Sequence, residues 1–233
     1  MHDFIWFSLL TDKINHQNIH VVMAALVALI ITIVIILVHR RLKNTEERLI
    51  PNPKGTLVNV FEMAVEKILD LMEGVMGPRA EQFFPLIGTL FIYIFLCNVM
   101  GLIPGFLPPT DNVNTNFAMS ITVFLYYNYC GIREQGIKNY LKHLMGPLVW
   151  LAPLMFVVEL VGHCVRPISL SLRLFGNMTG DHLVLGIFSN LTPILVPVIF
   201  MALGLFISFI QAFVFTLLSM VYLSLAIAHE EHE

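Results

Sequence analysis

The sequence predicts an all-α integral membrane protein. We expect five transmembrane helices, one amphipathic helix on the cytoplasmic surface, and a final hairpin of two long, tilted helices. Of the 233 residues, 57% are hydrophobic and only 12% are charged, which lies far outside the balance of a soluble domain. Several apolar runs reach the roughly 20 residues that a helix needs to cross a bilayer. Basic residues gather in alternate connections, as in a multi-pass chain.

The first span is expected at residues 19–38, a nearly uninterrupted apolar run. Five basic residues follow it: Arg40, Arg41, Lys43, Arg48 and Lys54. Short connections rich in Lys and Arg face the cytoplasm, so the N-terminus is expected outside. No small-residue cleavage site accompanies the run. We therefore expect the segment to remain as an anchor, not as a removable signal peptide.

Residues 56–76 predict an amphipathic helix and not a span. Apolar residues fall on one face, and the other face carries Asn59, Glu62, Glu66, Asp70 and Glu73. An acidic face suits anionic lipid poorly, so we expect the helix to lie along the cytoplasmic surface, packed on protein. An ordinary solvated face explains the same pattern equally well.

Two further spans are expected at residues 83–107 and 114–131. The connection at residues 110–116 contains no Lys or Arg, which is typical of an outside loop. Basic residues after position 131 return the chain to the cytoplasm: Arg133, Lys138 and Lys142. The second of these spans is long enough only when its polar ends are included.

The C-terminal part is expected to form the hairpin, from residues 147–190 and 194–228. The first of these stretches is longer than one upright crossing needs and has no charged turn, so it predicts one long, tilted helix. Five spans place the C-terminus in the cytoplasm. No internal repeat or second domain is visible, and residues 1–233 are expected to form a single membrane domain.

Charge and cysteine usage exclude several classes of protein. The net charge is −3, and the thirteen Lys and Arg residues are spread along the chain, without the basic patch that nucleic acids require. Cys97, Cys130 and Cys164 each stand alone in or beside an apolar run, which suggests neither a disulfide framework nor a zinc site. The His-Glu-Glu-His tail at 229–232 lacks the HExxH spacing of metalloenzymes. No metal, cofactor or catalytic site is expected.

The residues that carry chemistry form a polar stripe in the first long helix. Its members are Glu159, His163, Arg166, Arg173, Asn177 and Asp181. Their spacing stays close to one helical face, although Pro167 is expected to kink the helix locally. A charged group at bilayer depth costs roughly 3 kcal/mol, so such residues line a water-filled path or meet a buried partner.

Arg173 lies too far from both helix ends to snorkel, and we expect it near mid-membrane. A guanidinium keeps its proton, so it pairs with a carboxylate but cannot relay protons. We interpret Arg173 as a gate. It separates Glu159 and His163 on the cytoplasmic side from Asn177 and Asp181 on the outer side, which predicts two half-channels that do not join. The alternative is a buried ion pair with an acid of the same chain.

Three further polar residues are candidates for the path. Gln211 stands alone in the last helix and could bond to Arg173, to a passing carboxylate, or simply to a neighbouring helix. An imidazole ordinarily titrates near neutral pH; His182 could pass protons from the outer side or be a satisfied, non-titrating side chain. Asn98 could line the path or serve as a cap or turn residue.

The run Arg-Pro-Ile-Ser-Leu-Ser-Leu-Arg-Leu-Phe-Gly-Asn-Met at residues 166–178 resembles the signature of subunit a of the F-type ATP synthase. The similarity extends to Gln-Ala-Phe-Val-Phe at 211–215 and Val-Tyr-Leu-Ser at 221–224. It extends more loosely to Asn-Val-Met-Gly-Leu-Ile-Pro at 98–104 and to residues 111–120. With the matching order of spans, the resemblance covers nearly the whole chain.

This resemblance implies a stationary proton-translocating subunit of a rotary motor, with no active site of its own. Arg173 would face a rotating ring of c subunits, keep each ring carboxylate ionised as it passes, and block a direct leak. Glu159, Asn177 and Gln211, with Ser169 in the signature, would lie on the path or around the arginine. The implied partners are the c ring, the b-subunit stator, the rest of the F1Fo complex and membrane lipid, in a bacterial inner membrane.

One position departs from the family pattern. Many bacterial relatives pair a Glu on the first long helix with a His on the last, whereas this chain has His182 at the Glu position and Gly204 opposite. We predict that His182 supplies the titratable group and that Gly204 leaves room for its ring. The rival function is an independent ion-coupled secondary transporter, which would favour inverted repeats and broken helices. The sequence displays neither feature.

Overall fold

The computed structural model describes residues 19–42, 57–103, 106–145, 152–191 and 195–227. The element order is α1 (Ile19–Leu42), α2 (Leu57–Met76), η4 (Gly77–Arg79), α3 (Ala80–Met100), η5 (Pro109–Asp111), α4 (Val113–Met145), α5 (Ala152–Leu191) and α6 (Leu195–Ile227). No strand occurs in these ranges. The fold is that of an all-α membrane protein, as predicted.

Four helical stretches of the described chain are long and apolar enough to cross a membrane: Ile19–Arg40, Phe61–Met100, Pro153–Phe188 and Val196–Ile227. The expected span at 114–131 lies in α4 and is not among them, because Asn, Thr, Ser and Tyr residues interrupt its apolar run. The count of five spans therefore stays a prediction. The residues at 229–232 lie outside the described part.

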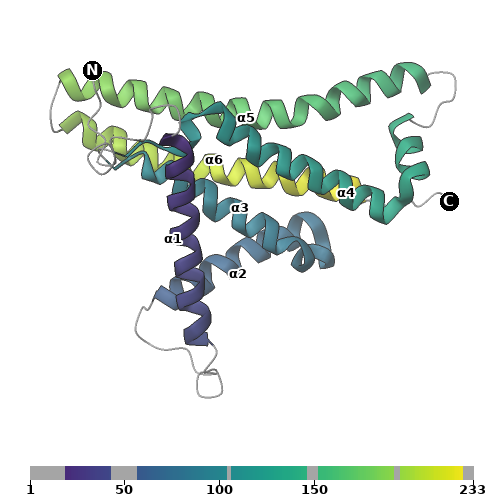
Figure 1. The fold of residues 1–233 in the computed structure, drawn as a ribbon, viewed down its shortest axis with the longest axis horizontal. Helices are drawn as coiled ribbons and strands as arrows, with labels where there is room; N and C mark the ends of the chain where they lie inside the picture. The colour runs from purple at the N-terminus through teal and green to yellow at the C-terminus, as the bar shows by residue number, and fades with distance from the viewer. Residues whose placement is uncertain (1–18, 43–56, 104–105, 146–151, 192–194, 228–233) are drawn as a thin grey trace.

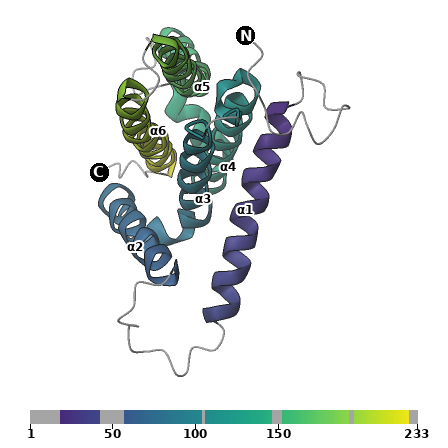
Figure 2. The same cartoon turned by 90° about the vertical axis from the view of Figure 1, so that its left-hand side faces the viewer.

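The segment expected to be amphipathic forms α2, which folds back against α3 (Figure 2). The turn passes through Gly77, whose φ of 70° lies in the region that glycine adopts without a steric penalty. Ile68 and Met72 of α2 are buried, whereas Glu62, Glu66, Asp70 and Glu73 are exposed. One face therefore packs on the protein and the other is acidic. Its location at the cytoplasmic surface stays a prediction.

Helix α4 contains a sharp turn at Gly136, where φ is 76° and ψ is 153°. Helical structure thus continues past residue 131, where the expected span ended, and resumes after the turn in a different direction (Figure 1). The basic residues that follow position 131 are compatible with a helix. Only glycine at 136 permits the change of direction at low cost.

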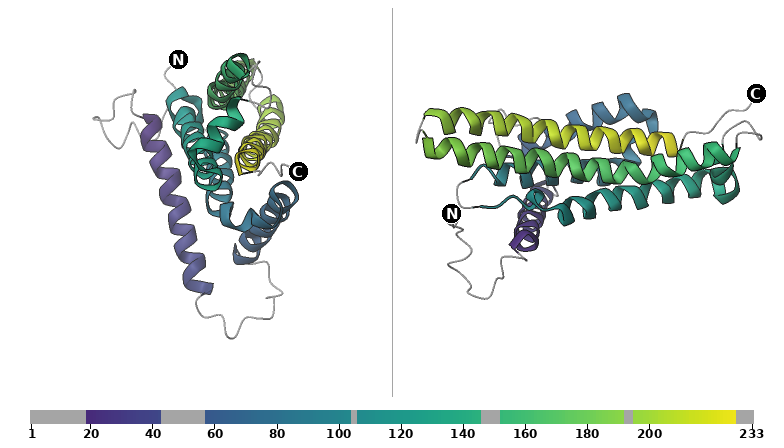
Figure 3. Two further views of the ribbon diagram at one scale, coloured as in Figure 1. Left: turned by 90° about the vertical axis from the view of Figure 1, so that its right-hand side faces the viewer. Right: turned by 90° about the horizontal axis from the view of Figure 1, so that it is seen from above.

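Helices α5 and α6 run antiparallel as the expected hairpin (Figure 3). Helix α4 packs mainly on α5, and α3 packs mainly on α6. Pro167 stands inside α5 without ending it. The main core joins side chains from α2, α3, α4, α5 and α6, among them Ile87, Tyr127, Leu174 and Met220.

Helix α1 packs separately, through Met23 and Val27 against Cys97 and Met100 of α3. It runs across the α5–α6 hairpin and not along it (Figure 1). The outward faces of α1, α5 and α6 expose many large apolar side chains, as expected where lipid or another membrane protein covers them. If α1 stands upright in a bilayer, the hairpin is strongly tilted within it.

Candidate functional site

Arg173 lies near the middle of α5, roughly 30 Å from each end at 1.5 Å per residue. Its side chain is exposed, beside the exposed apolar residues Leu172 and Ile168. Ser169 and Asn177 stand one turn before and after it and are also exposed. The opposite face of α5 is the packed one, with Leu170, Leu174 and Met178 buried. The arginine therefore faces away from its own protein.

No ion pair or hydrogen bond joins Arg173 to another residue of the described chain. The alternative in which it pairs with an acid of its own chain finds no support in this part of the structure. A guanidinium on an apolar face at membrane depth costs about 2.5–3.5 kcal/mol on insertion scales. Such a charge needs an anion or a polar path from outside this chain.

Gln211 lies on α6 and is buried, with 8% of its surface exposed. Its neighbours Ser208 and Ala212 are buried as well, so this face of α6 packs inward. No hydrogen bond between Gln211 and Arg173 is formed in the structure, although both residues are described. Of the residues expected around the arginine, only Ser169 and Asn177 share its exposed face.

The N-terminal half of α5 carries a partly buried ion pair. A guanidinium nitrogen of Arg166 lies 3.3 Å from Glu159 Oε1, and both side chains are partly buried. The Arg166 guanidinium also lies over the ring of Tyr222 on α6, 5.0 Å from its centroid. Stacking of this kind is favourable for a guanidinium in a partly desolvated position. The stripe residues Glu159 and Arg166 thus bind each other, and Arg166 also contacts Tyr222 of α6.

His163 completes this group, together with two residues of α4 that sequence reasoning missed. Its Nε2 lies 2.8 Å from Asn128 Oδ1 and 3.2 Å from the Tyr140 hydroxyl. A cavity of about 170 Å³ lies beside them, which we call the Glu159 cavity. It is large enough for water, and its lining residues are Gln135, Tyr140, Glu159, His163, Arg166, Leu225 and Ala226.

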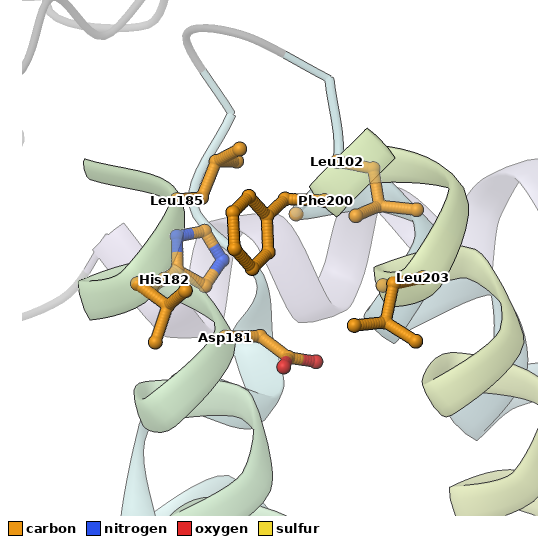
Figure 4. Close-up of a pocket in the computed structure, with 9 residues that line it drawn as sticks. Leu102, Asp181, His182, Leu185, Phe200 and Leu203 are labelled. Atoms are coloured by element: carbon orange, nitrogen blue, oxygen red, sulfur yellow. The ribbon is translucent and has the colours of Figure 1, made fainter. Parts of the chain in front are cut away.

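The C-terminal half of α5 contributes a second, smaller cavity, of about 30 Å³, which we call the His182 pocket. Figure 4 shows Asp181 and His182 from α5 facing Phe200 and Leu203 from α6, with Leu102 alongside. One carboxylate oxygen of Asp181, Oδ2, is buried and has no hydrogen-bond partner in the described chain. An unpaired buried oxygen of this kind can hold a proton or a water molecule.

The residue that makes room for the His182 ring is Gly101, whereas the sequence interpretation gave that role to Gly204. A Cβ at position 101 would lie only 2.7 Å from His182 Nε2. A Cβ at Gly204 would instead meet Leu102 Cδ2, also at 2.7 Å. Both glycines line the pocket, but only Gly101 is in close contact with the imidazole.

Asn98 is 1% exposed and fully engaged in the core. Its Oδ1 accepts the Thr110 hydroxyl at 2.8 Å, and its Nδ2 donates to the backbone oxygen of Ser208 at 3.4 Å. Asn116 Nδ2 donates to the backbone oxygen of Thr110 at 2.8 Å. These bonds tie α3 to η5 and α6, so Asn98 supports the structure and does not line either cavity.

The two cavities thus lie in opposite halves of α5, with Arg173 between them along the helix but on a different face. The stripe follows the edge of the packed face of α5. The residues at its two ends are therefore partly buried, whereas Arg173 and Asn177 in its middle are exposed. Within the described ranges, no three His, Cys, Asp or Glu side chains stand close enough to hold a metal ion.

Comparisons with known proteins agree on one family. The model of the family described as "ATP synthase A chain" matches residues 21–224. The chain is 46% identical to ATP synthase subunit a of Trichlorobacter lovleyi over 231 residues, which cover 98% of this chain and all of that one. It is 48% identical to ATP synthase subunit a of Bdellovibrio bacteriovorus over 79% of this chain and 81% of that one. It is 51% identical to ATP synthase subunit a of Geobacter sulfurreducens over 76% and 77%, respectively.

Proposed function

The chain belongs to the ATP synthase A chain family, and we propose that it is the stationary subunit through which protons drive the rotor of an F-type ATP synthase. The observation that carries this proposal is Arg173, a permanent cation in the middle of α5. It is exposed on an apolar face and unpaired among the described residues. Such a charge requires an anion or a polar path, and in this proposal the anion is a carboxylate on a neighbouring, moving subunit.

In this proposal, protons reach the rotor through two separate half-channels. The Glu159 cavity supplies one side, and the His182 pocket with Asp181 supplies the other. Arg173 lies between them and cannot release its proton. A proton must therefore pass from one half-channel to the rotor carboxylate, remain bound there while the rotor turns, and be released into the other half-channel. The moving carboxylate stays ionised as it passes the guanidinium because opposite charges favour the ionised form. Ser169 and Asn177 would line that passage on the exposed face of α5, whereas Gln211 would lie behind it, buried on α6.

The partners in this proposal are a ring of c subunits against the outward face of α5 and α6, a b-subunit stator, and the rest of the F1Fo complex. In this proposal the chain conducts protons, and the catalysis of ATP synthesis belongs to other subunits. We place it in a bacterial inner membrane with the N-terminus outside and the C-terminus in the cytoplasm, because the basic connections follow that topology.

The rival function, an independent secondary transporter, is not favoured. Transporters of that kind bind their substrate at discontinuous helices related by an inverted repeat. Here the two helices that carry the polar residues, α5 and α6, are continuous over the ranges described. An outward-facing, unpaired arginine also fits poorly with a transporter that works alone, because its substrate site would lie inside the bundle.

The test is the pair of variants Arg173→Ala and Arg173→Lys in the whole complex, assayed in inverted membrane vesicles. We expect both to insert into the membrane at normal levels. Arg173→Ala should abolish both ATP-driven proton pumping and proton-driven ATP synthesis. Arg173→Lys should also fail to restore full function, because an ammonium lacks the planar fork and loses its proton when desolvated.

The matched control is Arg133→Ala, which removes another exposed arginine, from α4, that lies outside both cavities. It should retain coupling. Immunoblots of the membranes separate a loss of function from a loss of protein. Near-normal pumping and synthesis in Arg173→Ala would contradict the proposed role.

A further inference from the structure

Helix α4 turns sharply at Gly136, and Tyr140, which follows the turn, packs against the part of α4 that precedes it. The chain turns at Gly136, and the ring of Tyr140 then lies against Gly131. A Cβ at position 131 would come within 2.7 Å of Tyr140 Cε2. The two glycines thus have separate roles, one permitting the turn and the other admitting the ring. The segment after the turn is held close to α4 and α5.

Hydrogen bonds around Asn128 hold Tyr140 in this place. Asn128 Nδ2 donates to the backbone oxygen of Phe124 at 2.7 Å, which directs the amide oxygen to the other side. That oxygen accepts the Tyr140 hydroxyl at 2.8 Å and lies 2.8 Å from His163 Nε2. Because Asn128 Oδ1 can only accept, the hydrogen on His163 must be on Nε2.

The other ring nitrogen of His163, Nδ1, is buried and has no hydrogen-bond partner in the described chain. The contacts of Nε2 therefore hold the ring beside Tyr140. The charged and titratable groups nearby are Arg166 and Glu159 on α5, Tyr127 and Tyr140 on α4, and Tyr222 on α6. His163 thus positions Tyr140.

Tyr140 at the same time forms one wall of the Glu159 cavity. The end of α6 also lines the cavity, through Leu225 and Ala226. Gln135, which precedes the turn, donates through Nε2 to the backbone oxygen of Ala226 at 3.0 Å. The width of the cavity beside Glu159 therefore depends on where the segment after Gly136 is held.

We propose that Tyr140, held by Asn128 and His163, is a gate residue that controls the access of water to the Glu159 cavity. The inference rests on the proposed function, in which water must reach Glu159 for one half-channel to conduct. Tyr140 acts through its position and touches no reacting proton, so it is a positioning residue. Releasing its hydroxyl should let the segment move away from α5 and open the cavity.

The experiment measures the accessibility of the cavity directly. In a chain whose native cysteines are replaced, Ala226→Cys places a thiol in the cavity wall. Permeabilised membrane vesicles containing the whole complex are treated with a water-soluble methanethiosulfonate, and the labelling rate is followed by mass. Tyr140→Phe keeps the ring and removes the hydroxyl. We expect it to raise the labelling rate about fivefold to tenfold, as the loss of one ordinary hydrogen bond predicts.

Asn128→Leu, which removes the shared acceptor, should raise the rate in the same direction. Tyr129→Phe is the matched control, because Tyr129 is an exposed tyrosine on the same helix and should leave the rate unchanged. A second thiol at the exposed position Glu73→Cys on α2 should label equally fast in all variants, which reports a normally folded subunit.

An unchanged labelling rate at position 226 in Tyr140→Phe and Asn128→Leu would overturn the gate. A rise at both thiols would also overturn it, because that outcome indicates general loosening of the fold. The measurement does not depend on coupling. If Arg173→Ala retains pumping while Tyr140→Phe opens the cavity, the proposed function fails and the gate stands; the reverse pair of results removes the gate alone.

Discussion

The close contact between Gly101 and His182 predicts a specific effect of Gly101→Ala. Gly101 has helical φ and ψ of −66° and −17°, so an alanine there suffers no backbone strain. The difficulty is steric. The new methyl would lie 2.7 Å from His182 Nε2, and 2.8 and 2.9 Å from Pro108 Cγ and Cβ. Real Cβ contacts at these distances do not persist, so the neighbours must move.

The magnitude follows from which neighbour can move. The Pro108 ring is rigid and buried, so it cannot rotate away from the methyl. Overpacking of this kind typically destabilises a fold by about 1–3 kcal/mol. The imidazole of His182 can turn, but it would then leave the pocket that Gly101 opens for it. We therefore expect both a loss of stability and a displaced His182.

Thermal denaturation of the detergent-solubilised complex, followed by the amount of soluble subunit, measures the first effect, and ATP-driven pumping measures the second. Gly74→Ala on α2 is the matched control, because no atom lies within 4 Å of the added Cβ. In the last turn of that helix the change should be neutral or stabilise by at most roughly 0.5–1 kcal/mol. A Gly101→Ala complex as stable as the Gly74→Ala complex, with unaltered pumping, would refute the reasoning.

Two further predictions concern polar residues, one in this pocket (His182) and one in the core (Asn98). His182→Ala should lower ATP-driven pumping and change its pH profile, if the imidazole serves the outer half-channel; wild-type activity at every pH tested would contradict that role. Asn98→Ala should destabilise the subunit by about 1–3 kcal/mol, because the buried Thr110 hydroxyl loses its acceptor. Thermal denaturation of the solubilised complex checks the second prediction, and an unchanged midpoint would show that the Asn98 bonds are dispensable.

Much of the helical architecture could be predicted because hydrophobicity is a local property. An apolar run long enough for a bilayer identifies a helix without knowledge of its neighbours, and α1, α5 and α6 follow the expected ranges closely. The turn at Gly136 was not predicted. A glycine among polar residues indicates a loop and a redirected helix equally well, and only the contact between Tyr140 and Gly131 distinguishes them.

The candidate site also contains residues that the sequence could identify and residues that it could not. Glu159, His163 and Arg166 could be selected from sequence because charged residues are costly inside an apolar helix. Their partners Asn128, Tyr140 and Tyr222 could not be selected, since they come from other helices. Asn128 had one available signal, as an amide inside an otherwise apolar and aromatic stretch.

The position of His182 illustrates a second limit of sequence reasoning. The resemblance to subunit a, and not the spacing of residues, suggested that Gly204 faces the imidazole. The choice between Gly204 and Gly101 depends on how α3 approaches α5, and no periodicity within one helix contains that information. Gly101 could be seen in the sequence run at 98–104, but its contact with His182 could not.

The different faces of α5 support the proposal that protons do not cross through this chain alone. The Glu159 cavity and the His182 pocket are lined from α5 and its packed neighbours, whereas Arg173 faces outward between them. A helix advances about 1.5 Å per residue, so Glu159 and His182 are separated by roughly 35 Å along α5. Protons cannot cross that distance without a chain of titratable groups or water. The two arginines between them on α5, Arg166 and Arg173, keep their protons. Under the proposed function, the carrier therefore approaches from outside, on the face where Arg173 is exposed, and moves from one cavity to the other.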